Sequence, residues 1–171
     1  MIKEYALIFF NLFTLLVIHI VFFSNLNLFG IVNPSVFLLF ILLYKFDSEQ
    51  VNFIIFSFLY GILLDLILQT AGNHSISMLF ISFLRPTIIR FSLGDNFENN
   101  SILSNIRFYN KAIFISSVTL IHQIIFYSFE FFDFLMFFEI IKLTILNSLF
   151  TVILLLGFLN FFRNKSWEKN F

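Results

Sequence analysis

A few polar side chains interrupt otherwise apolar runs, and these are the residues whose types suit chemistry. They are Asp65, His19 and the neighbouring pair His122 and Gln123. A carboxylate and imidazoles can move protons, hold a small ligand or coordinate a metal ion. The helices that carry these groups can bring all four side chains toward one cavity. We call His19, His122 and Gln123 the polar cluster, and Asp65 would lie at the same cavity.

The sequence predicts neither a metal site nor a cofactor at these residues. It lacks diagnostic ligand spacing such as HExxH. Hydrogen bonds between helices are the ordinary role of such groups, each typically worth about 0.6 kcal/mol. Asp65 keeps two interpretations. It is either a structural carboxylate, hydrogen-bonded to a neighbouring helix or to loop amides around Gly72 and Asn73, or a group that handles a ligand or a proton.

Enzyme chemistry has little support in the sequence. There is no Cys, and we find no Gly-rich phosphate loop, nucleophile elbow or pair of carboxylates within one apolar run. We therefore expect a protein that is not an enzyme.

The composition decides the class of protein that must position these side chains. Hydrophobic residues make up 60% of the 171 residues, charged residues 12%, and 30 residues are Phe. The mean hydropathy is +0.97. A soluble domain of this size could not bury that much hydrocarbon, because its surface must be largely polar. The composition excludes a soluble enzyme, a nucleic-acid binder and a disordered chain, and it indicates an integral membrane protein in contact with lipid.

The apolar runs are long enough for membrane-spanning helices, which need about 20 residues each. We predict an all-α bundle of six transmembrane helices in a single domain, 1–171, joined by short loops such as 70–74. The second helix reaches a spanning length only if it begins near residue 29, with Pro34 in its first turn, where proline is tolerated. The predicted helices are 5–24, 29–46, 51–69, 75–93, 112–130 and 140–162.

Basic residues are distributed asymmetrically when the N-terminus is placed in the cytoplasm. Nine of the ten Lys and Arg residues then lie on the cytoplasmic side, and Lys142 is the exception. This positive-inside bias predicts that both termini are cytoplasmic. Two roles stay open for the cytoplasmic cations: some snorkel to the lipid headgroups, or they form a basic surface that docks a partner. The basic surface would consist of Arg85, Arg90, Arg107 and Lys111.

Two short patterns predict local packing. Gly61 lies one helical turn before Asp65, so a small residue and a carboxylate share one helix face, and that face is expected to be buried against another helix. Pro86 follows Arg85 inside the predicted helix 75–93. Because proline lacks an N–H group, we expect a bend or an end there, with Ser82 or the Arg85 side chain covering the freed carbonyl groups.

Several of these positions resemble the MreD family of rod-shape-determining membrane proteins. Asn33 and Pro34 open the predicted second helix, a G-x-x-x-D segment from Gly61 to Asp65 lies in the third, and Gly72 follows in a short loop. The chain length and the six-span plan agree as well, so the resemblance covers nearly the whole chain.

The resemblance implies a non-catalytic scaffold of the bacterial cell-elongation machinery, located in the cytoplasmic (inner) membrane. Its partners would be an MreC-like protein, the MreB filament, a RodA-type glycosyltransferase and a class B penicillin-binding protein, together with membrane lipids and without nucleic acid. In that setting Gly61, Asp65, Gly72 and Pro34 would have structural or partner-binding roles in organising peptidoglycan synthesis and cell shape.

A second reading comes from a different class of membrane protein. Substrate-binding subunits of ECF-type vitamin transporters are also small six-helix proteins, and the MreD fold is thought to be similar to theirs. On that reading Asp65 and the polar cluster would line a ligand pocket, as sparse polar groups do in transporters.

Overall fold

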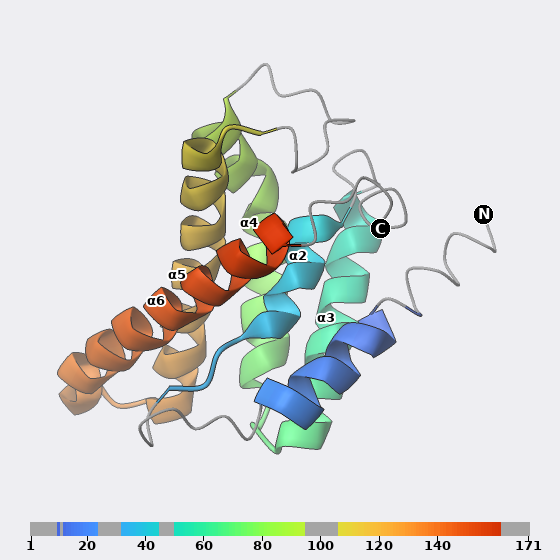
Figure 1. The fold of residues 1–171 in the computed structure, drawn as a ribbon. Helices are drawn as coiled ribbons and strands as arrows, with labels where there is room; N and C mark the ends of the chain where they lie inside the picture. The colour runs from blue at the N-terminus through green and yellow to red at the C-terminus, as the bar shows by residue number, and fades with distance from the viewer. Residues whose placement is uncertain (1–9, 11, 24–31, 45–49, 95–105, 162–171) are drawn as a thin grey trace.

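The computed structural model describes residues 10, 12–23, 32–44, 50–94 and 106–161, and every regular element among them is helical (Figure 1). The first is an apolar helix, Leu12–Phe23, which ends in the π-helical turn η1, His19–Phe23. The elements that follow are η2 (Val36–Leu38), α2 (Leu39–Leu43), α3 (Gln50–Leu68), α4 (Asn73–Leu93), α5 (Phe108–Phe131), η4 (Phe134–Met136) and α6 (Phe137–Phe161).

Four of these helices are long and apolar enough to cross a membrane, which indicates a multi-pass membrane protein. They are α3, α4, α5 and α6, and they correspond to the predicted spans 51–69, 75–93, 112–130 and 140–162. Their outward faces are apolar, with Leu66 at 72% exposure and Phe83 at 67%. Such faces are suited to lipid contact, because lipid tails solvate hydrocarbon. The six-helix count and the side on which the termini lie stay predictions.

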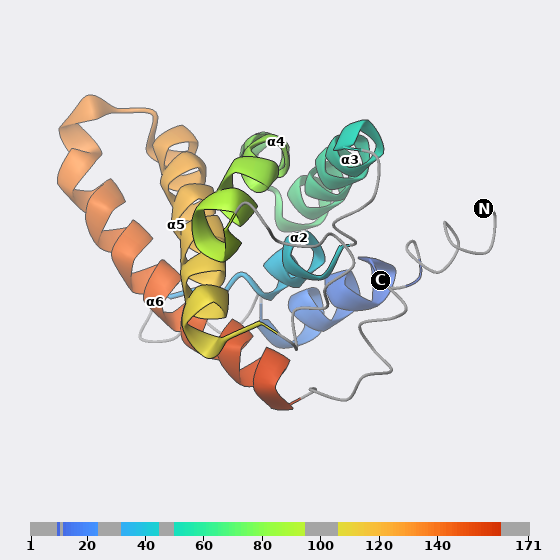
Figure 2. The ribbon, with the colours of Figure 1, turned by 90° about the horizontal axis from the view of Figure 1, so that it is seen from above.

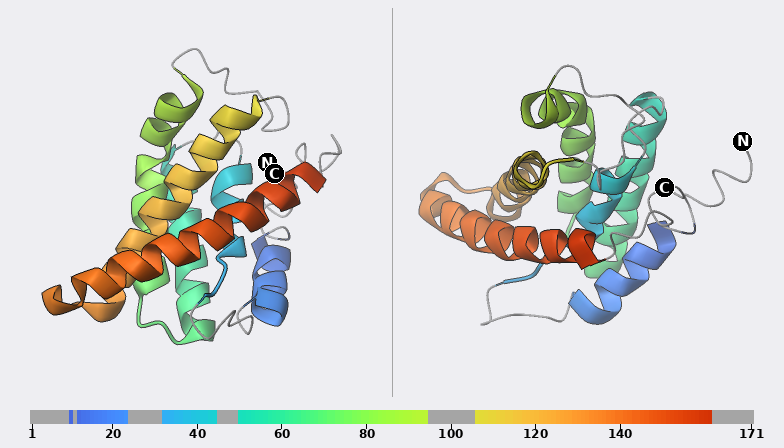
Figure 3. Two further views of the ribbon diagram at one scale, coloured as in Figure 1. Left: turned by 60° about the vertical axis from the view of Figure 1, so that its left-hand side comes forward. Right: turned by 45° about the horizontal axis from the view of Figure 1, so that its top comes forward.

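The long helices surround a short central one. Consecutive helices pack together, α3 on α4, α4 on α5 and α5 on α6. Viewed from above, α2 lies inside the arc made by α3, α4, α5 and α6, and the helix Leu12–Phe23 lies beside it (Figure 2). α6 runs obliquely across the bundle (Figure 3). The core therefore centres on α2.

The predicted second helix, 29–46, is wrong at its start. Residues 32–35 are not helical, and the helix covers only 36–43. Pro34 lies in the non-helical segment and not in the first turn of a helix. The residue before a proline is disfavoured in the α region, which explains why the chain is not helical at Asn33. The helix also ends earlier than predicted, at Leu43, with Tyr44 as a non-helical C-cap. Residues 29–31, 45 and 46 of the prediction lie outside the described residues.

Hydrogen bonds to α6 hold the non-helical segment. The backbone N–H of Asn33 donates to the Asn147 side-chain oxygen at 2.8 Å, and that of Ser35 donates to the Thr151 hydroxyl at 3.1 Å. Backbone groups at membrane depth must find partners inside the protein, since lipid offers none. Polar side chains of α6 thus replace the helical hydrogen bonds that residues 32–35 lack.

The helix at 36–43 is buried on all its faces. Phe37 is 1% exposed, and Leu38, Leu39, Phe40, Ile41 and Leu42 are fully buried. A helix that is apolar all round belongs in a core. Aromatic rings pack at its far end, with Phe40 5.6 Å from Tyr60 and Tyr44 4.7 Å from Phe53, both measured between ring centroids.

α4 continues through Pro86 without ending. Proline leaves the carbonyl of the residue four positions earlier without its helical donor, and that residue is Ser82. The side-chain amide of Gln50, at the start of α3, donates to the Ser82 carbonyl at 3.0 Å. The expected end of the helix at Pro86 is therefore wrong, whereas the expected bend stays a prediction. The donor to the freed Ser82 carbonyl comes from α3 and not from the Ser82 or Arg85 side chain.

Candidate functional site: the α3–α4 junction and a histidine-lined cavity

α3 and α4 approach each other closely at Gly61. A Cβ atom added there would lie 2.6 Å from the Ser75 Cα and 2.9 Å from the His74 carbonyl oxygen. Both neighbours are backbone atoms, which cannot move aside as the end of a flexible side chain can. Only glycine therefore fits, as expected for a small residue at a helix–helix crossing in a membrane.

Asp65, one turn further along α3, caps the N-terminus of α4. Its Oδ1 accepts a hydrogen bond from the His74 backbone N–H at 2.9 Å, and its Oδ2 accepts one from the Ser75 N–H at 2.8 Å. The hydroxyl groups of Ser75 and Thr70 donate to the same carboxylate. The hydrogen bonds expected for a structural Asp65 are therefore present.

The geometry explains why α4 needs this carboxylate. Gly72 precedes the helix with a φ of 99°, a conformation that favours glycine, and it has no side chain with which to cap. His74 and Ser75 are the second and third residues of α4, whose N–H groups a capping side chain normally satisfies. Asp65 performs this role from another helix, and its negative charge lies at the positive end of the α4 dipole.

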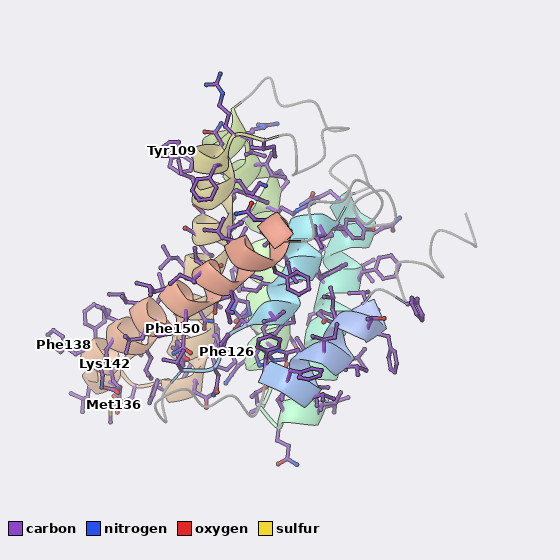
Figure 4. All side chains as sticks on the ribbon, viewed as in Figure 1. Tyr109, Phe126, Met136, Phe138, Lys142 and Phe150 are labelled. Atoms are coloured by element: carbon purple, nitrogen blue, oxygen red, sulfur yellow. The ribbon has the colours of Figure 1, made fainter. Side chains whose placement is uncertain are left out.

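All three histidines of the chain converge on Phe37. The centroid distances from the Phe37 ring are 4.9 Å to His19, 5.1 Å to His74 and 5.3 Å to His122, and all three contacts are edge-on. The rings of His74 and His122 stack at 6.0 Å. Phe126 lies 4.6 Å from His74 and is labelled in Figure 4.

These imidazoles are buried and incompletely hydrogen-bonded. His19 is 4% exposed, His74 6% and His122 fully buried. The Nδ1 atoms of all three and the Nε2 atom of His122 have no hydrogen-bond partner among the described residues. A buried polar atom without a partner is uncommon in native proteins and requires a physical reason.

A cavity of about 350 Å³ adjoins this cluster, between the apolar helix Leu12–Phe23, the 32–37 segment and the long helices. Its aromatic walls are Phe37, Phe126 and Tyr127, and Glu130 also lines it. The polar side chains that line it are His19, Asn33, Ser35, Thr70, His74 and Gln123. Because Ser35 belongs to the non-helical segment, irregular backbone lines this cavity, as is typical of ligand sites in membrane proteins.

The structure brings most of the polar cluster together and rearranges the rest. His19 and Gln123 line the cavity, and Gln123 donates to the Ser35 hydroxyl at 2.9 Å. His122 packs behind Phe37 and is not a lining residue. Asp65 is not one either; it reaches the cavity only through its hydrogen bonds to Thr70 and His74.

Sequence reasoning missed His74. The residue falls within the predicted loop 70–74, whereas α4 begins at Asn73 and turns His74 inward. A signal was available, because Gly72 followed by polar residues marks a helix start. Over the described part of the chain, no group of three or more His, Asp or Glu side chains is arranged to hold a metal ion.

The predicted basic surface is only partly a surface. Arg90 and Arg107 are exposed, but Arg85 and Lys111 are each only 4% exposed, so their assignment to it is wrong. The Arg85 guanidinium donates to the Tyr44 carbonyl oxygen and lies 4.6 Å from the centre of the Phe53 ring. Arg85 thus joins α4 to the end of α2 and to α3, where a cation–π contact compensates part of the burial of its charge.

No protein-family model, curated protein or solved structure matches this chain. The resemblance to the MreD family is therefore a prediction from the sequence.

Proposed function

We propose that the protein is a non-catalytic membrane scaffold of the bacterial cell-elongation machinery, of the MreD type. The observation that carries the proposal is the α3–α4 junction. Gly61 permits the close approach of α4, and Asp65 caps it. A close helix crossing and a helix cap at two of the residues that carry the resemblance support a structural role for them in such a scaffold.

The state of the Asp65 carboxylate also favours a scaffold over an enzyme. It accepts hydrogen bonds from two backbone N–H groups and two hydroxyl groups, those of Thr70 and Ser75. A carboxylate engaged in this way has its acceptor positions occupied and has little capacity left to take a proton from a substrate.

We place the contact with the membrane helix of an MreC-like protein in the groove between α5 and α6. This groove has a volume of about 590 Å³ and is lined by apolar side chains such as Ile124 and Ile141. Thr144, Ser128 and Asp133 also line it, and the Thr144 hydroxyl oxygen is buried without a partner among the described residues. A transmembrane helix fits an apolar groove with one unpaired hydroxyl, because hydroxyl groups form hydrogen bonds across helix pairs in membranes.

Co-purification from membranes tests this contact. Ile124→Trp should fill the groove and lower recovery of the MreC-like protein, whereas Ile153→Trp, at an exposed position elsewhere on α6, should not. Equal recovery with both variants would show that the groove holds only lipid. Depletion of the protein from a rod-shaped host should give round cells, and rods of normal width would contradict the scaffold role.

The membrane topology is part of the same proposal. The exposed Arg90 and Arg107 would face the cytoplasm, where the MreB filament lies. Tyr109 and Lys142, at opposite ends of the bundle in Figure 4, would then lie near opposite membrane surfaces. Reporter fusions at residue 100 and at the C-terminus should both report a cytoplasmic location. A periplasmic signal at either site would reverse this assignment.

The RodA-type and penicillin-binding synthases would meet the scaffold within the bilayer.

A second candidate function is supported by the histidine-lined cavity. A substrate-binding subunit of an ECF-type vitamin transporter would use such a cavity to hold its cargo. The two functions differ in their stable partners. Recovery of a transporter ATPase with the purified protein would favour transport, and recovery of an MreC-like protein would favour the scaffold.

A further inference from the structure

We infer that the cavity between Phe37, His74 and Glu130 binds a small organic cation that carries N–H groups and an aromatic ring. The inference does not depend on the scaffold proposal, because neither Asp65 nor any residue of the α5–α6 groove lines this cavity.

The first argument is the set of unsatisfied imidazoles. His19 and His74 both line the cavity, both are more than nine-tenths buried, and the Nδ1 atom of each lacks a hydrogen-bond partner. A neutral imidazole nitrogen without a hydrogen accepts a hydrogen bond. A ligand with N–H groups would therefore supply the donors that the protein itself does not.

The second argument is the charge of the lining. Glu130 is its only carboxylate, and no Lys or Arg is among the described lining residues. The Asn73 side-chain amide donates to one Glu130 oxygen. A site with one fixed negative charge and no permanent positive charge attracts cations and repels anions.

The third argument is the arrangement of the aromatic rings. Phe37, Phe126 and Tyr127 line the cavity, with Phe126 and Tyr127 edge-on to each other at 5.3 Å. Aromatic faces attract organic cations and stack on planar rings. The volume of about 350 Å³ is near the lower limit of ligand pockets, so the ligand is small.

The local backbone agrees with a binding role. His19 opens the π-helical turn η1, and Ser35 belongs to the non-helical segment 32–35. Single π-helical turns and interrupted membrane helices both occur frequently at functional sites.

Three probes of one shape test the inference on the full chain in detergent. Benzylammonium is a cation with N–H groups, benzyl alcohol is neutral and phenylacetate is an anion. Saturation-transfer NMR titrations, with empty detergent micelles as the blank, give the dissociation constants. Benzylammonium should bind about tenfold more tightly than phenylacetate, as expected for combined charge and cation–π contributions.

Two variants and a matched control assign the binding to this cavity. Glu130→Gln, at an exposed carboxylate, should remove most of the preference for the cation. His74→Phe keeps an aromatic ring and should weaken the binding of benzylammonium. Glu139→Gln is the control, because Glu139 pairs with Lys142 on α6 at 3.1 Å and does not line the cavity. An equal effect of Glu139→Gln, tighter binding of phenylacetate, or binding no stronger than to the micelles would overturn the inference. None of these results depends on recovery of an MreC-like protein.

Discussion

The α3–α4 junction and the histidine-lined cavity are neighbouring polar regions that differ in whether their buried polar groups have hydrogen-bond partners. At the junction, Asp65 accepts four hydrogen bonds, and two of them satisfy backbone N–H groups at the start of α4. In the cavity, buried imidazole nitrogens of His19 and His74 lack partners. Buried polar groups stabilise a fold when satisfied and cost free energy when not. The junction therefore has the character of a structural element, whereas the cavity is the candidate binding site.

The largest expected effect is at Gly61. Gly61→Leu should prevent the close approach of α3 and α4, because even a Cβ atom would lie 2.6 Å from the Ser75 Cα. We expect loss of the monodisperse peak in size-exclusion chromatography in detergent. Gly157→Leu is the matched control, since nothing lies within 4 Å of a Cβ at that position. A Gly61→Leu protein that still gives a monodisperse peak would show that the fold does not need the close approach of α3 and α4.

Removal of the cap should have the next largest effect. Asp65→Ala leaves the N–H groups of His74 and Ser75 without their acceptor, which should cost about 1–3 kcal/mol of stability. Thermal unfolding in detergent, followed by circular dichroism, measures the change. Asp65→Asn should be milder because its side-chain oxygen can still accept one of these hydrogen bonds. An Asp65→Ala protein as stable as the parent would show that the cap is dispensable.

A smaller loss is expected where α6 holds the non-helical segment. Thr151→Val keeps the shape of the side chain but removes the acceptor of the Ser35 N–H. The expected cost is about 1 kcal/mol, near the upper range for such bonds in membranes. The same unfolding assay serves, with Ile153→Val as a conservative control on the exposed face of α6. Equal stability of Thr151→Val and the parent would mean that residues 32–35 do not need α6.

The smallest effect, and the opposite sign, is expected in the cavity. His19→Phe removes a buried Nδ1 that has no partner, so stability should be unchanged or slightly higher. Binding of benzylammonium should nevertheless become weaker, because the site loses an acceptor. A clear loss of stability in His19→Phe would show that His19 is structural, and the contrast between the two regions would disappear.

The sequence was informative wherever one stretch of chain determines the outcome. The position of Gly61 one turn before Asp65 predicted a buried face, and the structure places α4 there. The convergence of the polar cluster was also expected, although His74 lines the cavity and Asp65, which had been expected there, does not. α4 begins earlier than predicted because Asp65 satisfies its first N–H groups from outside the helix.

The basic residues show the same limit. Arg85 and Arg90 lie on one helix and look alike in sequence, yet Arg85 is buried under Tyr44 and beside Phe53, while Arg90 is exposed. Pro86 likewise breaks no helix, because Gln50 supplies a donor from another element. The burial of Arg85 and the continuation of α4 through Pro86 cannot be predicted from the residues that neighbour them in the sequence.

The sequence by itself determined that this is a helical membrane protein and where its four long helices lie, because lipid can accommodate only long apolar runs whose backbone hydrogen bonds are internal. Tertiary structure decided the course of residues 32–35, the cap on α4 and the ring of histidines around Phe37. Those features depend on partners far apart in the chain, such as Ser35 and Thr151, 116 positions apart. Local pattern carries no information on which distant side chain will supply a missing hydrogen bond.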